Sequence, residues 1–145
     1  MNPEVKTLWI NALRSGEYQQ TQGWLNKGTG FCCLGVLCDL YLKTVKPTDA
    51  RWIDKVAPGD VRLFEFDAVT SADPDYPVSH SHNGASLPEP VQEWAGLSDD
   101  DPAVNYGQEE EQYGGGYERP FGALSEINDS GFTFTDIAQE IESQL

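Results

Sequence analysis

The sequence predicts a single α+β domain over residues 1–145, in which smaller elements surround a buried central helix. Residues 31–41, FCCLGVLCDLY, form the longest apolar run, and Asp39 is the only charge in it. Apolar residues recur at helical spacing near both ends of the chain, and shorter segments between them alternate as strands do. A chain of 145 residues is long enough for one hydrophobic core.

An N-terminal helix is expected over about residues 3–15. Asn2 suits the capping position, Pro3 suits the first helical position, and Gly16 suits a left-handed end. One apolar stripe follows the helical period, and its members are Val5, Leu8, Trp9, Ala12 and Leu13.

A β-hairpin is predicted to follow this helix. Residues 17–25 alternate as a strand does, residues 26–30 have turn composition, and residues 31–33 are expected to pair back. One face of the first strand then presents amides and aromatic rings, which suit a planar ligand. These side chains are Tyr18, Gln20, Gln22 and Trp24.

The central helix is predicted over residues 33–43, and it is apolar on nearly all sides, as buried helices are. Gly35 permits the close approach of a neighbouring backbone, and Pro47 stops the helix. Beyond it, less regular segments predict short strands and then further helices. Residues 61–66 are expected to form a strand, and residues 51–53 a short strand or a turn. The expected helices are residues 87–97, a short one at 124–127 and a last one capped by Thr133 and Asp136.

No metal site is predicted. Cys32 and Cys33 are adjacent and Cys38 lies five residues further on, so we expect three buried, reduced thiols. His80 and His82 lie in a polar loop beside flexible acids, which is a weak signal for a metal. Two segments, residues 71–86 and 105–120, are expected to be flexible loops because they are rich in Pro, Asp, Gly and Glu.

The charge is distributed unevenly along the chain. The total is −15, but residues 1–62 have a net charge of +2 and residues 63–145 a net charge of −17, with Arg119 as their one basic residue. Such a chain does not favour direct DNA binding through phosphate neutralisation. The first half is suited to a small anion, and the second half is suited to a basic protein surface.

The longest apolar run is too short to cross a bilayer, so no membrane association is expected. The sequence MNPEVK lacks the pattern of a secretory signal, which favours a cytoplasmic location. The C-terminal helix pair superficially resembles the first part of a helix-turn-helix, but it is acidic and no recognition helix follows.

The whole chain resembles a family of small uncharacterised proteins from bacteriophages and prophages. The resemblance is carried by PEVKTLWINALRSGEYQQTQGWL, GFCCLGVLCDLY, LPEPVQEWAGLSDDDP and LSEINDSGFTFTDIAQEIESQL. It implies a phage accessory protein that acts in the cytoplasm of a bacterial host, and it implies no catalytic residues. Such proteins often counter host defence, and by analogy the resemblance implies the same role here.

The first functional hypothesis is a non-enzymatic protein that binds and sequesters a small nucleotide-type signal of the host. A nucleotide needs an aromatic platform for its base, amides for the base edge and cations for its phosphates. The candidate ligand-binding residues are Arg14, Tyr18, Gln20, Gln22, Trp24, Arg51 and Trp52.

The alternative is an acidic inhibitor that mimics nucleic acid and blocks a basic site on a host protein. Its candidate residues are Asp99, Asp100, Asp101, Glu109, Glu110 and Glu111. A second alternative is an uncharacterised enzyme, although the sequence shows no nucleophile–base pair, no phosphate loop and no signal for a cofactor. The uneven charge is also compatible with a homo-oligomer.

Overall fold

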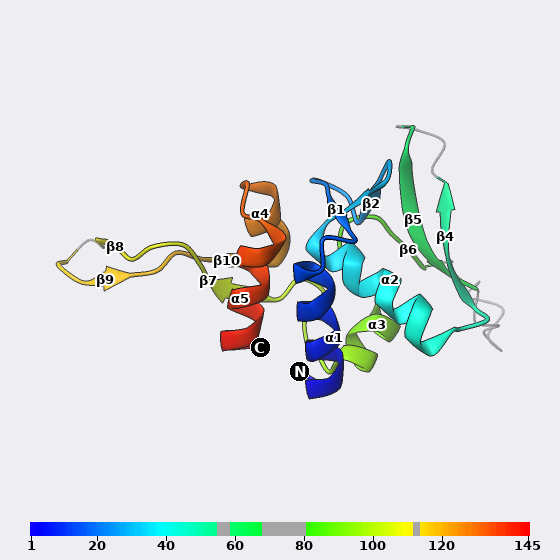
Figure 1. Cartoon of the computed structure of the whole chain (residues 1–145), viewed down its shortest axis with the longest axis horizontal. Helices are drawn as coiled ribbons and strands as arrows, with labels where there is room; N and C mark the ends of the chain where they lie inside the picture. Colours follow the sequence, from blue (N-terminus) through cyan, green and yellow to red (C-terminus); the bar gives the residue numbers. More distant parts are fainter. Residues whose placement is uncertain (55–58, 68–80, 112–113) are drawn as a thin grey trace, which may run out of the picture.

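The computed structural model describes residues 1–54, 59–67, 81–111 and 114–145, which form one small α+β domain (Figure 1). The helices in the described residues are α1 (Pro3–Arg14), α2 (Cys33–Val45), α3 (Glu89–Ala95), α4 (Leu124–Asp129) and α5 (Phe134–Gln144). The strands are β1 (Gln19–Gln20), β2 (Asn26–Lys27), β3 (Gly30–Phe31), β4 (Ala50–Asp54), β5 (Val61–Phe66), β6 (Ser81–Asn83), β7 (Ala103–Asn105), β8 (Glu110–Glu111), β9 (Tyr117–Glu118) and β10 (Phe121–Ala123).

The strands form one mixed sheet and two small ribbons. The sheet has the order β1-β3-β2-β5-β4, and β6 also pairs with β5. The ribbons are the antiparallel pairs β7–β10 and β8–β9. Figure 1 shows β4 and β5 on one side of the molecule, the helices in the middle, and β8–β9 projecting from the opposite side.

The first two turns of α2 are the centre of the core. Every residue from Cys32 to Cys38 is buried. Helices α1, α3 and α4 all contact α2, which explains why the helix is apolar on several sides. The indole Nε1 of Trp9 donates a hydrogen bond of 2.9 Å to the carbonyl of Cys33, so even the one polar atom of this buried ring is satisfied.

Gly35 is the point of closest approach between α2 and the rest of the chain. A Cβ atom on this residue would lie 1.8 Å from the carbonyl oxygen of Leu25. That oxygen accepts a hydrogen bond of 3.2 Å from the amide of Cys32, at the start of the helix. The glycine therefore lets the loop before β2 lie directly on the helix, as the sequence predicts.

The helix boundaries largely agree with the capping signals. Asn2 Oδ1 accepts a hydrogen bond of 3.0 Å from the amide of Glu4. Thr133 Oγ1 accepts one from the amide of Asp136, and the Asp136 carboxylate accepts one in return from the amide of Thr133. Gly96 ends α3 with a φ of 67°. The central helix continues two residues beyond its predicted end, to Val45.

The predicted strand over residues 17–25 is wrong in its extent. Only Gln19–Gln20 is a strand, and it pairs in parallel with β3. Gly23 has a φ of 81°, which turns the chain, and Leu25 is buried completely beside α2. The hairpin is therefore shorter and lies later in the chain, where Asn26 pairs with Phe31.

The strand predicted at residues 61–66 is present as β5, and residues 51–53, for which a short strand or a turn was expected, lie in strand β4. In the segment 71–86, residues 71–80 lie outside the described residues, and Ser81–Asn83 forms a strand on β5 where a loop was expected. Segment 105–120 contains β8 and β9, and its expected flexibility stays a prediction. No helix in the described parts of the chain has the length and hydropathy needed to cross a membrane.

Gly35→Ala is expected to lower the free energy of unfolding by about 3 kcal/mol or more, because the added methyl group meets a backbone carbonyl that cannot move without displacing β2. Gly116→Ala is the matched control, since no atom lies within 4 Å of its added Cβ. Urea denaturation measures both variants. Equal stability of the two would contradict the close approach at Gly35.

Candidate functional site

The most prominent surface feature is a projecting ribbon, residues 106–111 and 114–121, which we call the acidic ribbon (Figure 1). It continues the β7–β10 pair, in which Asn105 lies opposite Phe121. Beyond an irregular stretch it pairs again through β8 and β9. Four glutamates on it are exposed to solvent: Glu109, Glu110, Glu111 and Glu118.

Two of these carboxylates face each other. Glu110 lies directly opposite Glu118 in the antiparallel register, and Glu111 lies opposite Tyr117. Residues directly opposite in such a pair point to the same face, and like charges there are destabilising by a few tenths of a kcal/mol, up to about 1 kcal/mol. In the described part of the chain, no Lys or Arg forms an ion pair with any glutamate of the ribbon.

The one arginine of the ribbon is engaged at its base. The guanidinium of Arg119 forms an ion pair with Glu140 of α5, and its Nε donates a hydrogen bond of 3.1 Å to the carbonyl of Gly107. Gly107 has a φ of 66°, which permits the irregular backbone at this point. Arg119 therefore fixes the base of the ribbon, and among the described residues no cation is paired with the carboxylates further out.

The other predicted acidic residues lie elsewhere, in the turn between α3 and β7. Asp99 and Asp100 are exposed there. Asp101 instead supports the start of α4, because its carboxylate accepts hydrogen bonds from the amide of Ser125, at 3.0 Å, and from its hydroxyl. Burial raises the pKa of the Asp101 carboxyl. The structure thus gives Asp101 a role within the fold and separates it from the acidic ribbon.

Tyr18 and Trp52, both predicted to bind a ligand, converge on Asp39. The Tyr18 hydroxyl donates a hydrogen bond of 2.7 Å to this carboxylate, and the Trp52 indole donates one of 3.2 Å. Lys43 completes the cluster through an ion pair of 2.8 Å with Asp39. The ring of Phe31 lies edge-on to both aromatic rings, at centroid distances of 5.3 and 5.8 Å. The polar atoms of Tyr18 and Trp52 are therefore already occupied.

The two predicted phosphate-binding arginines are also in ion pairs. Arg14 lies 2.7 Å from Glu142 and ties α1 to α5. Arg51 lies on β4 and contacts Glu65 at 2.9 Å and Asp67 at 2.6 Å. The structure places these arginines on different elements, and neither lines a described cavity.

Trp24 lines a cleft of about 310 Å³ near the start of α2 and the start of α4. Three carboxylates line the same cleft, from Asp100, Asp101 and Asp129. Such a lining disfavours the phosphates of a nucleotide, because like charges repel at short range. The described residues that line the cleft with Trp24 include no Lys or Arg, which a nucleotide site needs for its phosphates.

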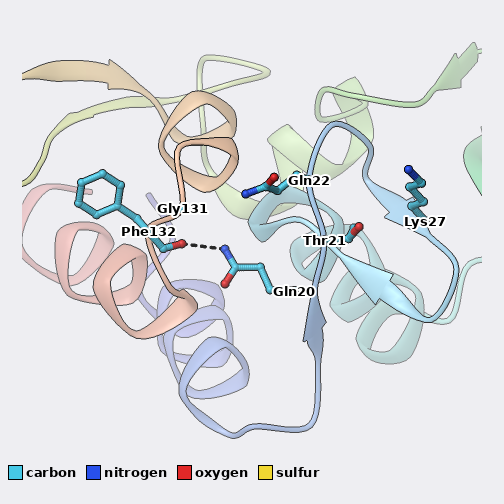
Figure 2. Close-up of a pocket in the computed structure, with 6 residues that line it drawn as sticks. All are labelled: Gln20, Thr21, Gln22, Lys27, Gly131 and Phe132. Carbon is cyan, nitrogen blue, oxygen red and sulfur yellow. Dashed lines mark hydrogen bonds between the residues drawn. The ribbon is translucent and has the colours of Figure 1, made fainter.

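Gln20 and Gln22 are brought together in a polar hollow of about 490 Å³ (Figure 2). Its remaining lining residues are Thr21, Lys27, Gly131 and Phe132. Figure 2 shows that the hollow lies between the chain around β1 and β2 and the corner between α4 and α5. Lys27 is the one positively charged side chain among the described residues that line the hollow.

Gln20 is a fixed part of this hollow. Its Nε2 donates hydrogen bonds to Asn128 Oδ1, at 3.0 Å, and to the carbonyl of Phe132, at 2.8 Å. Its Oε1 accepts one of 3.1 Å from the amide of Phe134. The side chain of Gln22, by contrast, is exposed to solvent.

A family model for a domain of unknown function, DUF8296, matches residues 1–145. The chain belongs to DUF8296. Comparisons with curated proteins and with solved structures give no significant match for this DUF8296 chain. The bacteriophage or prophage origin implied by the sequence resemblance stays a prediction.

The cysteines of this DUF8296 chain are buried and free, and burial raises the pKa of the Cys32 thiol to about 11. Within the described residues, no three His, Cys, Asp or Glu side chains are grouped so that they could hold a metal ion. His80 lies outside the described residues, and His82 is placed only by the backbone pairing of β6 with β5.

Sequence reasoning missed three relevant side chains. Lys27 falls in a segment of turn composition, yet it is the cation of the polar hollow. Asp39 falls in the apolar central run, yet it accepts hydrogen bonds from Tyr18 and Trp52. Glu118 lies near the acidic residues 109–111 only because the chain folds back as a hairpin. The signal for this hairpin in the sequence was the occurrence of Tyr and Glu on both sides of Gly114–Gly116.

Gln20→Ala is expected to lower the free energy of unfolding by about 2–3 kcal/mol, because it removes three hydrogen bonds and leaves the buried Asn128 with fewer partners. Gln22→Ala, two residues away in the same hollow, is expected to change it by less than about 0.5 kcal/mol. Urea denaturation followed by tryptophan fluorescence measures both. Similar losses in the two variants would contradict the structural role of Gln20.

Proposed function

We propose that this protein is a non-enzymatic phage accessory protein whose acidic ribbon occupies a basic site on a host protein. The proposal rests on the pair Glu110 and Glu118, which face each other on a ribbon exposed to solvent. An isolated two-stranded ribbon is only marginally stable, and a facing pair of like charges weakens it further. A cationic partner would remove this repulsion. The facing carboxylates are therefore unfavourable for the stability of the ribbon alone and favourable for binding to a basic surface.

Electrostatics gives such an interaction its speed and its salt dependence. The net charge of −15 creates a field that attracts a basic surface from a distance, and the projecting ribbon meets that surface first. Four exposed carboxylates on one narrow element resemble the charge density of a nucleic-acid backbone more than a dispersed acidic surface does. A host nuclease or nucleic-acid-binding protein is therefore the expected partner, and blocking it would counter host defence.

The double variant Glu110→Gln/Glu118→Gln is expected to reduce the retention of host proteins at least about fivefold, while its stability stays equal or rises by up to about 1 kcal/mol. The measurement uses immobilised protein, bacterial lysate at about 50 mM salt, and elution at about 500 mM salt. Stability is measured by urea denaturation. A loss of binding with unchanged or improved stability is the result that a purely structural ribbon would not give.

The matched control is Glu89→Gln/Glu93→Gln on α3, because it removes the same charge from exposed residues outside the ribbon. This control is expected to retain host proteins as the unmodified chain does. Equal losses in both double variants would show that only total charge matters, and the ribbon would then not be the binding element.

The second candidate function is sequestration of a small nucleotide-type ligand in the polar hollow. The observation that favours it is the grouping of Gln22, Thr21 and Lys27 around one cavity. An amide can bind a base edge, a hydroxyl group can bind a ribose, and an ammonium group can bind a phosphate. The ligand would be held without turnover, since no nucleophile–base pair is found among the described residues that line the hollow.

Lys27→Ala is expected to abolish a thermal shift that a linear or cyclic nucleotide produces, because the hollow then has no cation for the phosphate. Lys6→Ala on α1 removes the same charge elsewhere and is expected to leave the shift unchanged. Differential scanning fluorimetry with a panel of nucleotides checks this. If no nucleotide raises the melting temperature, the second candidate function is excluded.

A further inference from the structure

The acidic ribbon also exposes two aromatic rings. Tyr117 is 65% exposed and Phe121 is 69% exposed, whereas the other exposed large hydrophobic residues of the described chain, Leu8 and Val45, are 40% and 44% exposed. Burial of such a ring against a partner would gain the transfer free energy that its exposure to water forgoes. Both rings lie on the strands of the element that also carries the exposed carboxylates.

The backbone register shows which charges lie beside the rings. Glu111 is directly opposite Tyr117, so a carboxylate and a phenol ring share one face of the ribbon. At the base, Val104 is buried and pairs with Gly122, while Phe121 pairs with the exposed Asn105 and therefore lies on the face turned away from the core. Acidic groups and aromatic rings thus occur together on one projecting element, with Tyr117 and Glu111 on one face and the Glu110–Glu118 pair on the other.

This combination is complementary to one kind of protein surface. Proteins that bind single-stranded nucleic acid combine a positively charged groove, which follows the phosphates, with aromatic side chains on which the bases stack. Proteins that bind duplex DNA contact phosphates and the edges of paired bases, and the stacked bases leave no ring faces free for them. Exposed rings beside carboxylates match the first class.

We propose that the acidic ribbon occupies the basic, aromatic-lined groove of proteins that bind single-stranded nucleic acid. Its carboxylates take the place of phosphates, and Tyr117 and Phe121 take the place of bases. This inference rests on the proposed function of the ribbon and adds the class of partner. It also gives the two exposed rings a role that charge complementarity alone does not explain.

The test combines competition with substitution of the rings. Immobilised protein is loaded with bacterial lysate at low salt, and the bound proteins are released with single-stranded oligothymidylate or with duplex DNA of equal nucleotide content. Release by the single strand is expected at a nucleotide concentration at least about tenfold lower than release by the duplex. The released proteins are also expected to bind labelled oligothymidylate in fluorescence anisotropy.

Tyr117→Ser/Phe121→Ser keeps every charge of the ribbon and is expected to weaken retention at least about tenfold, because each lost stacking contact weakens binding severalfold. Leu8→Ser/Val45→Ser is the matched control, since it removes two exposed apolar side chains outside the ribbon. Its retention is expected to equal that of the unmodified chain. Circular dichroism and urea denaturation verify that all variants are folded.

Three results would overturn the inference. Release by duplex DNA at an equal or lower concentration assigns the ribbon to duplex-binding proteins. Unchanged retention after loss of both rings shows that charge alone is recognised. A dimer in gel filtration that disappears in the Tyr117→Ser/Phe121→Ser variant shows that a second copy of the chain covers the rings. The proposed function itself fails separately, if retention does not depend on Glu110 and Glu118.

Discussion

The close contact between Gly35 and the carbonyl group of Leu25 determines how the first half of this protein is arranged. Because the glycine has no side chain, the loop before β2 lies on the first turn of α2. The carbonyl oxygen of Leu25 in this loop also accepts a hydrogen bond from the backbone amide of Cys32. This contact fixes the short hairpin of β2 and β3 against the core. Strand β5 then pairs with β2, and the outer sheet is built from that position.

A second set of contacts joins the two ends of the chain around the same helix. Asn128 is fully buried. Its side-chain amide donates a hydrogen bond to the carbonyl of Thr21, and its side-chain oxygen accepts one from the backbone amide of Cys33. Gln20 bonds to Asn128 and to the start of α5. Buried amides need such complete pairing, because each unpaired group would cost about 1–3 kcal/mol. The chain segment that was expected to bind a ligand is therefore largely part of the fold.

The helices could be predicted from the sequence because capping residues and apolar periodicity are local signals. Asn2, Gly96 and the Thr133–Asp136 pair each act within one turn of their own helix. The strand at residues 17–25 failed because the alternation of Tyr18, Gln20 and Trp24 reflects separate tertiary contacts of these side chains, whereas Gln22 is exposed. No local pattern shows that Gln20 bonds to residues more than a hundred positions away. The same reason applies to Glu118, whose relation to Glu110 depends on a hairpin that the sequence did not predict.

The acidic ribbon is joined to the core through the paired strands β7 and β10. The amide of Leu124 donates to the carbonyl of Pro102 at 2.9 Å, and Asp101 holds Ser125 directly beside it. The acidic ribbon continues beyond the β7–β10 pair, and this pair closes it at its base because Val104 of β7 belongs to the core. The energetic cost of closing such a loop rises only slowly with its length. This architecture therefore allows the acidic ribbon to lengthen, shorten or change its side chains during evolution while the helical core stays the same, so that one scaffold can acquire new partners by exchanging a single segment.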